Sequence, residues 1–84
     1  MQKQTWHELK TWPPFFHDTF KGIKDFELRI NDRDYKKGDY LILKEWHPKI
    51  DKFTGRQVTR KIKYVFKGYF GLPENMVILG IEKV

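Results

Sequence analysis

The chain has 84 residues and no cysteine, and its 17 lysine and arginine residues against 11 aspartate and glutamate residues give a formal net charge of +6. This length allows one hydrophobic core and predicts a single domain over residues 1–84. The lack of cysteine excludes disulfides, thiolate chemistry and cysteine-based zinc sites, while the three Trp, four Tyr and seven Phe residues provide enough large side chains for a core.

The N-terminal part of the chain predicts one strand followed by one short helix. Residues 5–10 alternate loosely between apolar and polar side chains, which is typical of a strand. Pro13-Pro14 favours a helix start, because proline lacks the N–H group that a first helical turn leaves unpaired. Phe16 and Phe20 then lie one turn apart, and Gly22 stands where a C-terminal cap belongs. The helix is therefore expected to have about two turns.

Two strands are predicted in the middle of the chain. Residues 26–30 alternate apolar and charged side chains, so Phe26, Leu28 and Ile30 are expected to face a core while Glu27 and Arg29 share the opposite face. The polar residues 31–34 end that strand. After a turn at 37–39, residues 40–46 predict another strand, and residues 47–57, with one proline and a Thr-Gly pair, predict a long exposed hairpin loop.

Two further strands are predicted in the C-terminal part. Residues 58–66 alternate, with Thr59, Lys61 and Lys63 on one face and four apolar side chains on the other: Val58, Ile62, Tyr64 and Phe66. Residues 68–75 form a loop rich in turn residues, and the continuous apolar run at 76–81 is typical of a strand covered on both faces. About five or six strands with one helix indicate a mostly β (α+β) domain, curled or closed into a small barrel.

The positive charge is concentrated in one segment. Residues 44–67 hold eight basic and two acidic side chains, whereas the rest of the chain holds nine of each sign. A positive lobe on an otherwise balanced domain predicts a polyanionic partner, with RNA as the first candidate, because neutralised phosphates release their counterions. A solvated basic hairpin that only keeps the domain soluble gives the same pattern.

The sequence offers no signal for a membrane or a metal. Residues 1–10 contain three charged side chains and no apolar run, so no signal peptide is predicted, and no segment approaches the ~20 apolar residues of a membrane span. His7, His17 and His47 lack the spacing of a metal site. We therefore expect a cytoplasmic monomer without membrane contact, metal or organic cofactor.

Residues 22–29, Gly-Ile-Lys-Asp-Phe-Glu-Leu-Arg, fit the pattern Gly-x-Lys-x-x-Glu-x-Arg. This pattern resembles the signature of ASCH domains, which are relatives of the PUA fold. Further blocks at 7–10, 31–34, 38–39, 45–46, 54–56 and 71–73 look like a small bacterial and phage subfamily of stand-alone ASCH-like proteins of unknown function. The resemblance covers nearly the whole chain. It implies a PUA-like pseudo-β-barrel with a groove between the helix and one open side, and RNA binding or hydrolysis as the activities found in that superfamily.

The signature supplies the candidate ligand site. Arg29 offers a planar guanidinium to a phosphate or a base edge, Lys24 offers a mobile charge, and Glu27 either fixes one of them or accepts from a base amino group. A surface ion pair would produce the same pattern. Lys10 and His7 are expected to join the site from the first strand. Three basic side chains of the hairpin are expected to attract the phosphate backbone: Arg56, Lys61 and Lys63.

The aromatic side chains add a second expectation. They include more bulky rings than a core of this size hides, so some should lie at the rim of the groove, where a ring stacks on an unpaired base. The candidates are Trp6, Trp12, Tyr35, Trp46, Tyr69 and Phe70.

Two other functions stay open beside RNA binding. One ASCH-like branch hydrolyses the amide of acetylated cytidine with a Lys, Thr and Glu trio, and the resemblance places Lys24 at its Lys but Glu27 at its Thr. An amidohydrolase acting on acylated nucleosides would then use Lys24 and Glu27, with Glu27 as a general base on water. A protein-interaction module, by contrast, predicts binding that is insensitive to changes at Lys24 and Arg29.

Overall fold

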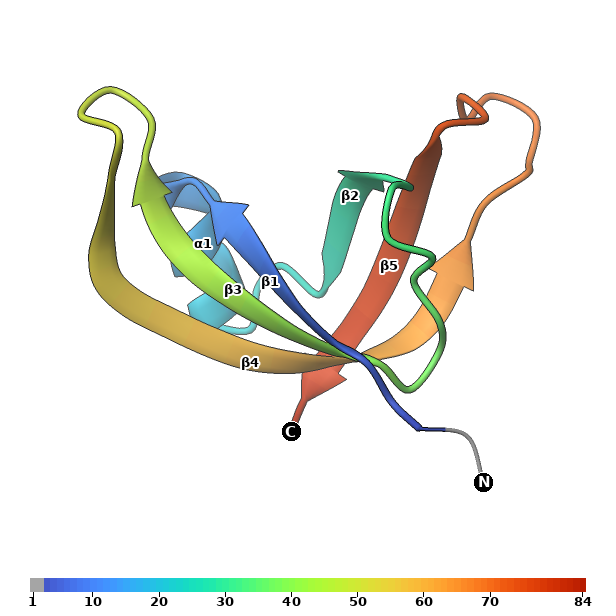
Figure 1. Ribbon diagram of the computed structural model, residues 1–84, viewed down its shortest axis with the longest axis horizontal. Helices are drawn as coiled ribbons and strands as arrows, with labels where there is room; N and C mark the ends of the chain where they lie inside the picture. The colour runs from blue at the N-terminus through green and yellow to red at the C-terminus, as the bar shows by residue number, and fades with distance from the viewer. Residues whose placement is uncertain (1–2) are drawn as a thin grey trace.

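The computed structural model describes residues 3–84, which form five strands and one helix: β1 (Trp6–Thr11), α1 (Pro13–Phe20), β2 (Phe26–Ile30), β3 (Tyr40–His47), β4 (Lys52–Phe66) and β5 (Met76–Lys83). All five strands belong to one sheet in the order β1-β3-β4-β5-β2, in which only β1 and β3 run parallel. The sheet curls into two arms that face each other (Figure 1). The predicted barrel-like fold with one short helix is therefore confirmed, as an open half-barrel.

The long strand β4 connects the two arms. Its first part pairs with β3 and its last part with β5, and the register shifts between Ile62 and Tyr64. Such a bulge bends a strand and increases its twist. Gly80 lies opposite the bulge, where a Cβ would come within 3.2 Å of the Tyr64 Cβ. The prediction that Ile62 and Tyr64 share one face is wrong because of this bulge. Ile62 is buried on the inner face of the sheet, whereas Tyr64 is exposed on the outer face.

The predicted hairpin loop at 47–57 is wrong, because β4 already begins at Lys52. The turn is short, and Asp51 adopts a positive φ of 55° within it. Trp46 pairs with Phe53 across the hairpin, and their rings lie 4.8 Å apart between centroids. The Thr54 hydroxyl donates to Oε1 of Glu45 at 2.6 Å. These cross-strand contacts keep the Thr-Gly pair inside β4, at a register shift between Lys44 and Trp46 where Gly55 adopts a positive φ of 94°.

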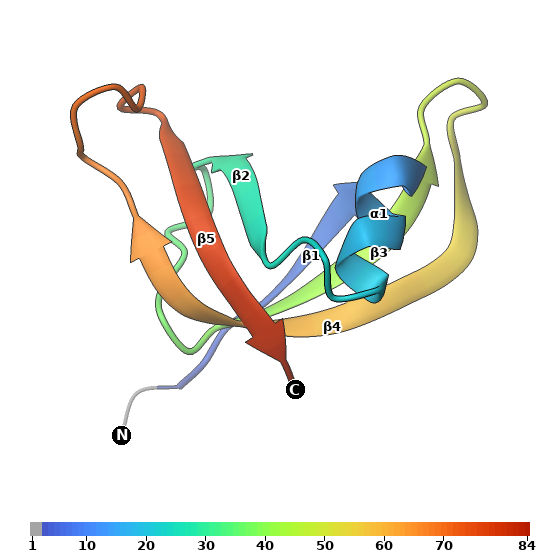
Figure 2. The same ribbon diagram turned by 180° about the vertical axis from the view of Figure 1, so that it is seen from behind.

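The core lies on the inner, concave face of the sheet. It is formed by buried apolar side chains from four strands and one loop: Leu9, Tyr35, Leu41, Leu43, Ile62, Val77, Leu79 and Ile81. Helix α1 packs on the arm that contains β3, with Phe16 and Thr19 fully buried (Figure 2). The apolar run of β5, predicted to be covered on both faces, is fully buried on its inner face and partly buried on its outer face. No helix within residues 3–84 is long and apolar enough to cross a membrane.

Strand β2 faces the opposite way from the prediction. Glu27 pairs with Leu79, and Arg29 pairs with Val77, and both β5 partners are fully buried. Since residues paired across two strands share a face, the two charged side chains point to the inside of the curved sheet. Glu27 is only 2% exposed, whereas the three apolar side chains of β2 are about half exposed. The prediction that Glu27 and Arg29 share one face is confirmed, but that face is the inner one.

Candidate ligand-binding site at the open seam

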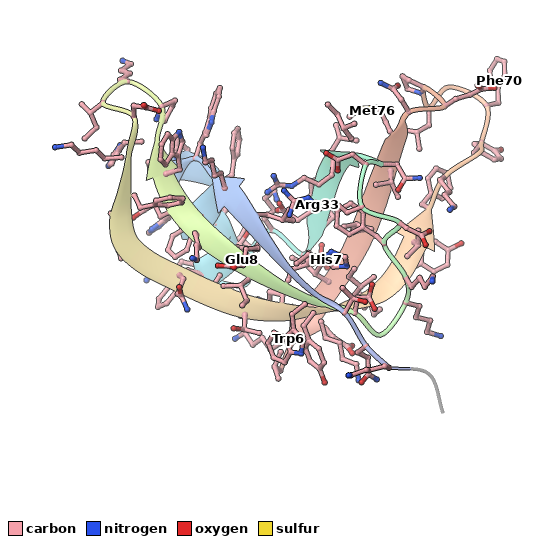
Figure 3. All side chains as sticks on the ribbon, viewed as in Figure 1. Trp6, His7, Glu8, Arg33, Phe70 and Met76 are labelled. Atoms are coloured by element: carbon pink, nitrogen blue, oxygen red, sulfur yellow. The ribbon has the colours of Figure 1, made fainter. Side chains whose placement is uncertain are left out.

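The edge strands β1 and β2 face each other across the concave side of the sheet without pairing (Figure 1). We call this gap the seam. Arg29 of β2 crosses it by donating from Nη2 to the Thr11 hydroxyl of β1 at 3.2 Å. Arg33, after β2, donates from Nη1 to the Glu8 carbonyl oxygen at 2.7 Å, and it lies between the two arms (Figure 3). Side chains therefore hold the seam together, and no backbone ladder closes it.

The signature residues Lys24, Glu27 and Arg29 form one hydrogen-bonded group at the seam. Lys24 donates to Oε2 of Glu27 and, at 2.6 Å, to the Phe26 carbonyl oxygen. Arg29 donates to Oε1 of Glu27 from Nε at 3.1 Å and from Nη2 at 2.6 Å. One nearly buried carboxylate therefore pairs with two cations, which leaves this group with an excess of positive charge. The Nη1 group of Arg29 has no acceptor within residues 3–84, so this nitrogen remains available to a ligand.

A pocket of about 690 Å³ opens beside this group, between α1 and β2. Thr11 and Glu27 are buried and form its polar floor. Its rim carries exposed or half-exposed apolar side chains: Trp12, Phe15, Ile23, Phe26 and Leu28. Ligand sites for small molecules commonly have volumes of roughly 300 to 1,000 Å³, with apolar walls and a few polar groups that orient the ligand. The pocket has the size and the lining of such a site.

A second hollow of about 490 Å³ adjoins the pocket and shares Lys10 and Arg29 with it. We call the two hollows together the seam groove. The Lys10 ammonium lies 3.9 Å from the centre of the Trp46 ring, which is a cation–π contact, and no carboxylate among residues 3–84 forms an ion pair with it. The groove is lined by three acidic side chains, Glu8, Asp18 and Glu27, and by five basic ones: Lys10, Lys24, Arg29, Arg33 and Lys44. This excess of positive charge favours an anionic ligand.

Four of the predicted site residues line the seam groove, namely Lys10, Lys24, Glu27 and Arg29. His7 does not line it. Its Nε2 lies 2.9 Å from Oδ2 of Asp39, and both side chains are buried.

Asp39 also accepts hydrogen bonds from the backbone N–H groups of Thr5 and Lys36. Burial pushes the pKa of Asp39 up, but the hydrogen bonds from His7 and these two N–H groups outweigh that effect and hold the pKa below its ordinary value of 3.8. The contacts of His7 therefore connect the start of β1 to the start of β3 and are structural.

The predicted hairpin residues lie outside the groove. The guanidinium carbon of Arg56 lies 5.1 Å from the centre of the Phe16 ring, so this side chain packs on α1. Lys61 pairs with Tyr40 and lies on the outer face of the sheet, with its ammonium 5.7 Å from the Tyr40 ring centre. Lys63 lies on the same outer face, beside Gly80 at the bulge. The basic segment is therefore spread over both faces of the sheet.

The six aromatic residues that are candidates for the rim of the groove lie in different parts of the structure. Trp12 lies at the rim of the pocket, as expected, and Trp46 supports Lys10. Tyr35 is buried, and Trp6 stacks on Tyr40 with centroids 4.3 Å apart. Phe70, next to Tyr69, is 96% exposed in the β4–β5 loop, far from the seam (Figure 3).

Several residues of the groove are absent from the sequence predictions. The alternation of residues 26–30 predicts core positions for Phe26 and Leu28, and nothing in the sequence separates Thr11 or Phe15 from ordinary strand and helix residues. Arg33 belongs to a polar block that ends a strand and that is part of the family resemblance, but neither feature predicts a place for it at the site. No group of three or more His, Cys, Asp or Glu side chains suited to a metal ion occurs in the described part of the chain, residues 3–84.

The fold and the groove define a class of small open half-barrels with a cationic, ring-bordered pocket between the helix and an edge strand. The chain belongs to the family described as a domain of unknown function (DUF3850), whose family model matches residues 6–81. It is also 43% identical over 56 residues to an uncharacterized 12.9 kDa protein in the GpA 3′ region of Escherichia phage P2. That match covers 67% of this chain and spans only half the length of the phage protein.

Proposed function

We propose that this protein is an ASCH-type, PUA-like domain that binds single-stranded RNA or a nucleotide-like ligand in the seam groove. The observation that carries the proposal is the pairing of a ring-bordered pocket with an adjoining hollow in which basic side chains outnumber acidic ones. An unpaired nucleotide has the matching parts, a flat aromatic base and a charged phosphate. The resemblance of residues 22–29 to the ASCH signature supports the same assignment.

The pocket supplies the surfaces that a base needs. Trp12 and Phe15 lie close together, with ring centroids 6.4 Å apart, and both are about half exposed. Stacking of a base on such a ring contributes roughly 1 to 3 kcal/mol and does not depend strongly on which base is bound. A base that enters the pocket would leave its phosphates near Lys10, Arg33 and Lys44 in the second hollow.

The hydrolase alternative finds less support in the geometry. It requires Glu27 to accept a proton from water, yet Glu27 is 2% exposed and its two oxygens already accept hydrogen bonds from Lys24 and Arg29. A general base must reach the proton that it removes, directly or through one water molecule. Incubation of the protein with acetylated cytidine, followed by chromatography for released cytidine, tests this alternative directly.

RNA binding is tested by fluorescence anisotropy with short labelled single strands and with a duplex of the same sequence, over a series of salt concentrations. The informative proteins are two matched double variants. The groove pair combines Lys10→Gln with Arg33→Gln, and the outer-face pair combines Lys61→Gln with Lys63→Gln. Each pair removes two positive charges, but only the first pair faces the groove. We expect the groove pair to reduce the salt slope by roughly 1.4, since each single-strand phosphate contact contributes about 0.7.

The outer-face pair should leave the salt slope close to that of the wild type. Thermal unfolding of all variants shows whether the loss of the Arg33 bond to Glu8 changes the fold instead of the contact surface. If the wild type binds no strand at low salt, the proposal is wrong. Equal effects of the two pairs would mean that a diffuse basic surface, and not the groove, attracts RNA.

A further inference from the structure

The free backbone edge of β2 lies at the pocket. Two hydrogen bonds fix the ladder pattern between β2 and β5: the Ile81 N–H donates to the Asp25 carbonyl oxygen at 2.9 Å, and the Asn31 N–H donates to the Asn75 carbonyl oxygen at 2.7 Å. Both pairs continue the register of β2 with β5. In an antiparallel ladder, hydrogen-bonded pairs alternate with pairs whose backbone groups point away. The even-numbered residues of β2 therefore direct their N–H and C=O groups to the seam.

These three even-numbered residues have different surroundings. The Phe26 carbonyl oxygen accepts from Lys24, which agrees with its position on the free edge. The Ile30 carbonyl oxygen accepts from the Asp32 N–H, and Ile30 lies outside the pocket lining. Leu28 lines the pocket, and neither its N–H nor its C=O is hydrogen-bonded by residues 3–84. Leu28 thus presents a donor and an acceptor side by side at the pocket wall.

We propose that the backbone of Leu28 pairs with the Watson–Crick edge of an unpaired nucleobase that enters the pocket. This inference rests on the proposed function and deepens it by naming what the pocket selects. The Watson–Crick edge of every nucleobase carries at least one donor next to one acceptor, so an extended residue can pair with it as it would with a neighbouring strand. The apolar rim, which includes Trp12 and Phe15, would hold the faces of the same base.

The ligand class follows from this geometry. A base inside a duplex has its Watson–Crick edge occupied, so the site should take bases of single strands, loops or free nucleotides and refuse paired ones. Because backbone groups make the contact, discrimination among the four bases should be weak. A methyl group in place of the donor on the Watson–Crick edge should block binding, since the Leu28 carbonyl oxygen loses its hydrogen bond and the methyl group cannot fit against that oxygen.

Two measurements on the wild-type protein test the inference without altering its fold. The first is an NMR titration with uridine monophosphate, in which the amide signal of Leu28 should move while that of Ile30 stays in place. The second compares labelled oligouridine strands with and without 3-methyluridine, where methylation should weaken binding about tenfold, the equivalent of roughly 1.4 kcal/mol.

A matched pair of variants adds a test on the protein side. Leu28→Pro removes the N–H that faces the pocket, and Ile30→Pro removes the same group from the same free edge outside the pocket. Edge strands accept proline where the N–H points away from the ladder. We expect Leu28→Pro to weaken oligouridine binding about 3- to 10-fold and Ile30→Pro to leave it unchanged.

The outcomes separate the two proposals. If methylated and unmethylated strands bind equally well, or if the Leu28 amide does not move, the backbone pairing is wrong. The proposed function would then still stand if the groove pair of variants weakens binding. If the wild-type protein binds neither uridine monophosphate nor oligouridine, both proposals are wrong.

Discussion

Replacement of Glu27 by glutamine should destabilise the protein by about 2 kcal/mol. The carboxylate is 2% exposed and accepts hydrogen bonds from Lys24 and Arg29. Glutamine keeps the shape of the side chain but turns one acceptor into an NH₂ group that faces a cation. A hydrogen bond to a charged group contributes roughly 1.5 to 3 kcal/mol. The lower part of that range applies here, because the Lys24 and Arg29 side chains are still 16% and 22% exposed, so water screens the unpaired charge.

The effect should be visible in thermal unfolding followed by circular dichroism at neutral pH. For a domain of this size, about 2 kcal/mol corresponds to a decrease in Tm of roughly 8 to 16 °C. Glu8→Gln is the matched control, because the Glu8 carboxylate is mostly exposed and pairs with Lys44 at the surface, and its Tm should stay at the wild-type value.

Removal of one cation from the variant provides a second check. Lys24→Met in the Glu27→Gln background should recover part of the lost stability, since fewer unpaired charges remain at the seam. An unchanged Tm for Glu27→Gln would refute the reasoning that this carboxylate stabilises the inward-facing charges of β2.

Two further predictions concern other parts of the half-barrel. Asp39→Asn should destabilise the protein at neutral pH. Because the folded-state pKa of Asp39 lies below 3.8, its contribution to stability is present above that pH and is lost as the pH falls through the folded-state value. The stability difference between wild type and variant, measured by urea unfolding, should therefore shrink on acidification. A constant difference would contradict this reasoning. Gly80→Ala should lower the Tm by an amount equivalent to about 1 kcal/mol, because the new Cβ would lie 3.2 Å from the Tyr64 Cβ at the bulge; a wild-type Tm would show that the bulge adapts freely.

Much of the fold was predictable from local patterns. Pro13-Pro14 and the spacing of Phe16 and Phe20 placed the helix correctly, and α1 spans Pro13–Phe20. Alternating side chains located β2 and the last part of β4. These features depend on residues only a few positions apart, so the sequence contains the information directly.

The candidate site was predictable in part. The short pattern at 22–29 brought Lys24, Glu27 and Arg29 together, and the structure joins them by hydrogen bonds. The extent of the groove was not predictable, because its other members come from distant segments. Arg29 reaches Thr11 across 18 positions and Arg33 reaches Glu8 across 25. The turn signals at 54–55 were misleading for the same reason, since cross-strand contacts in the hairpin outweighed them.

By itself, the sequence determined that β2 has one charged and one apolar face, that a two-turn helix precedes it, and that positive charge exceeds negative charge. Only the tertiary structure decided which face of β2 points inward. The alternation of a strand defines two faces but does not say which one meets the core. That choice depends on the register with β5, where Val77 and Leu79 lie opposite Arg29 and Glu27. It also depends on the curl of the sheet, which brings β1 close enough for Thr11 to accept a hydrogen bond from Arg29.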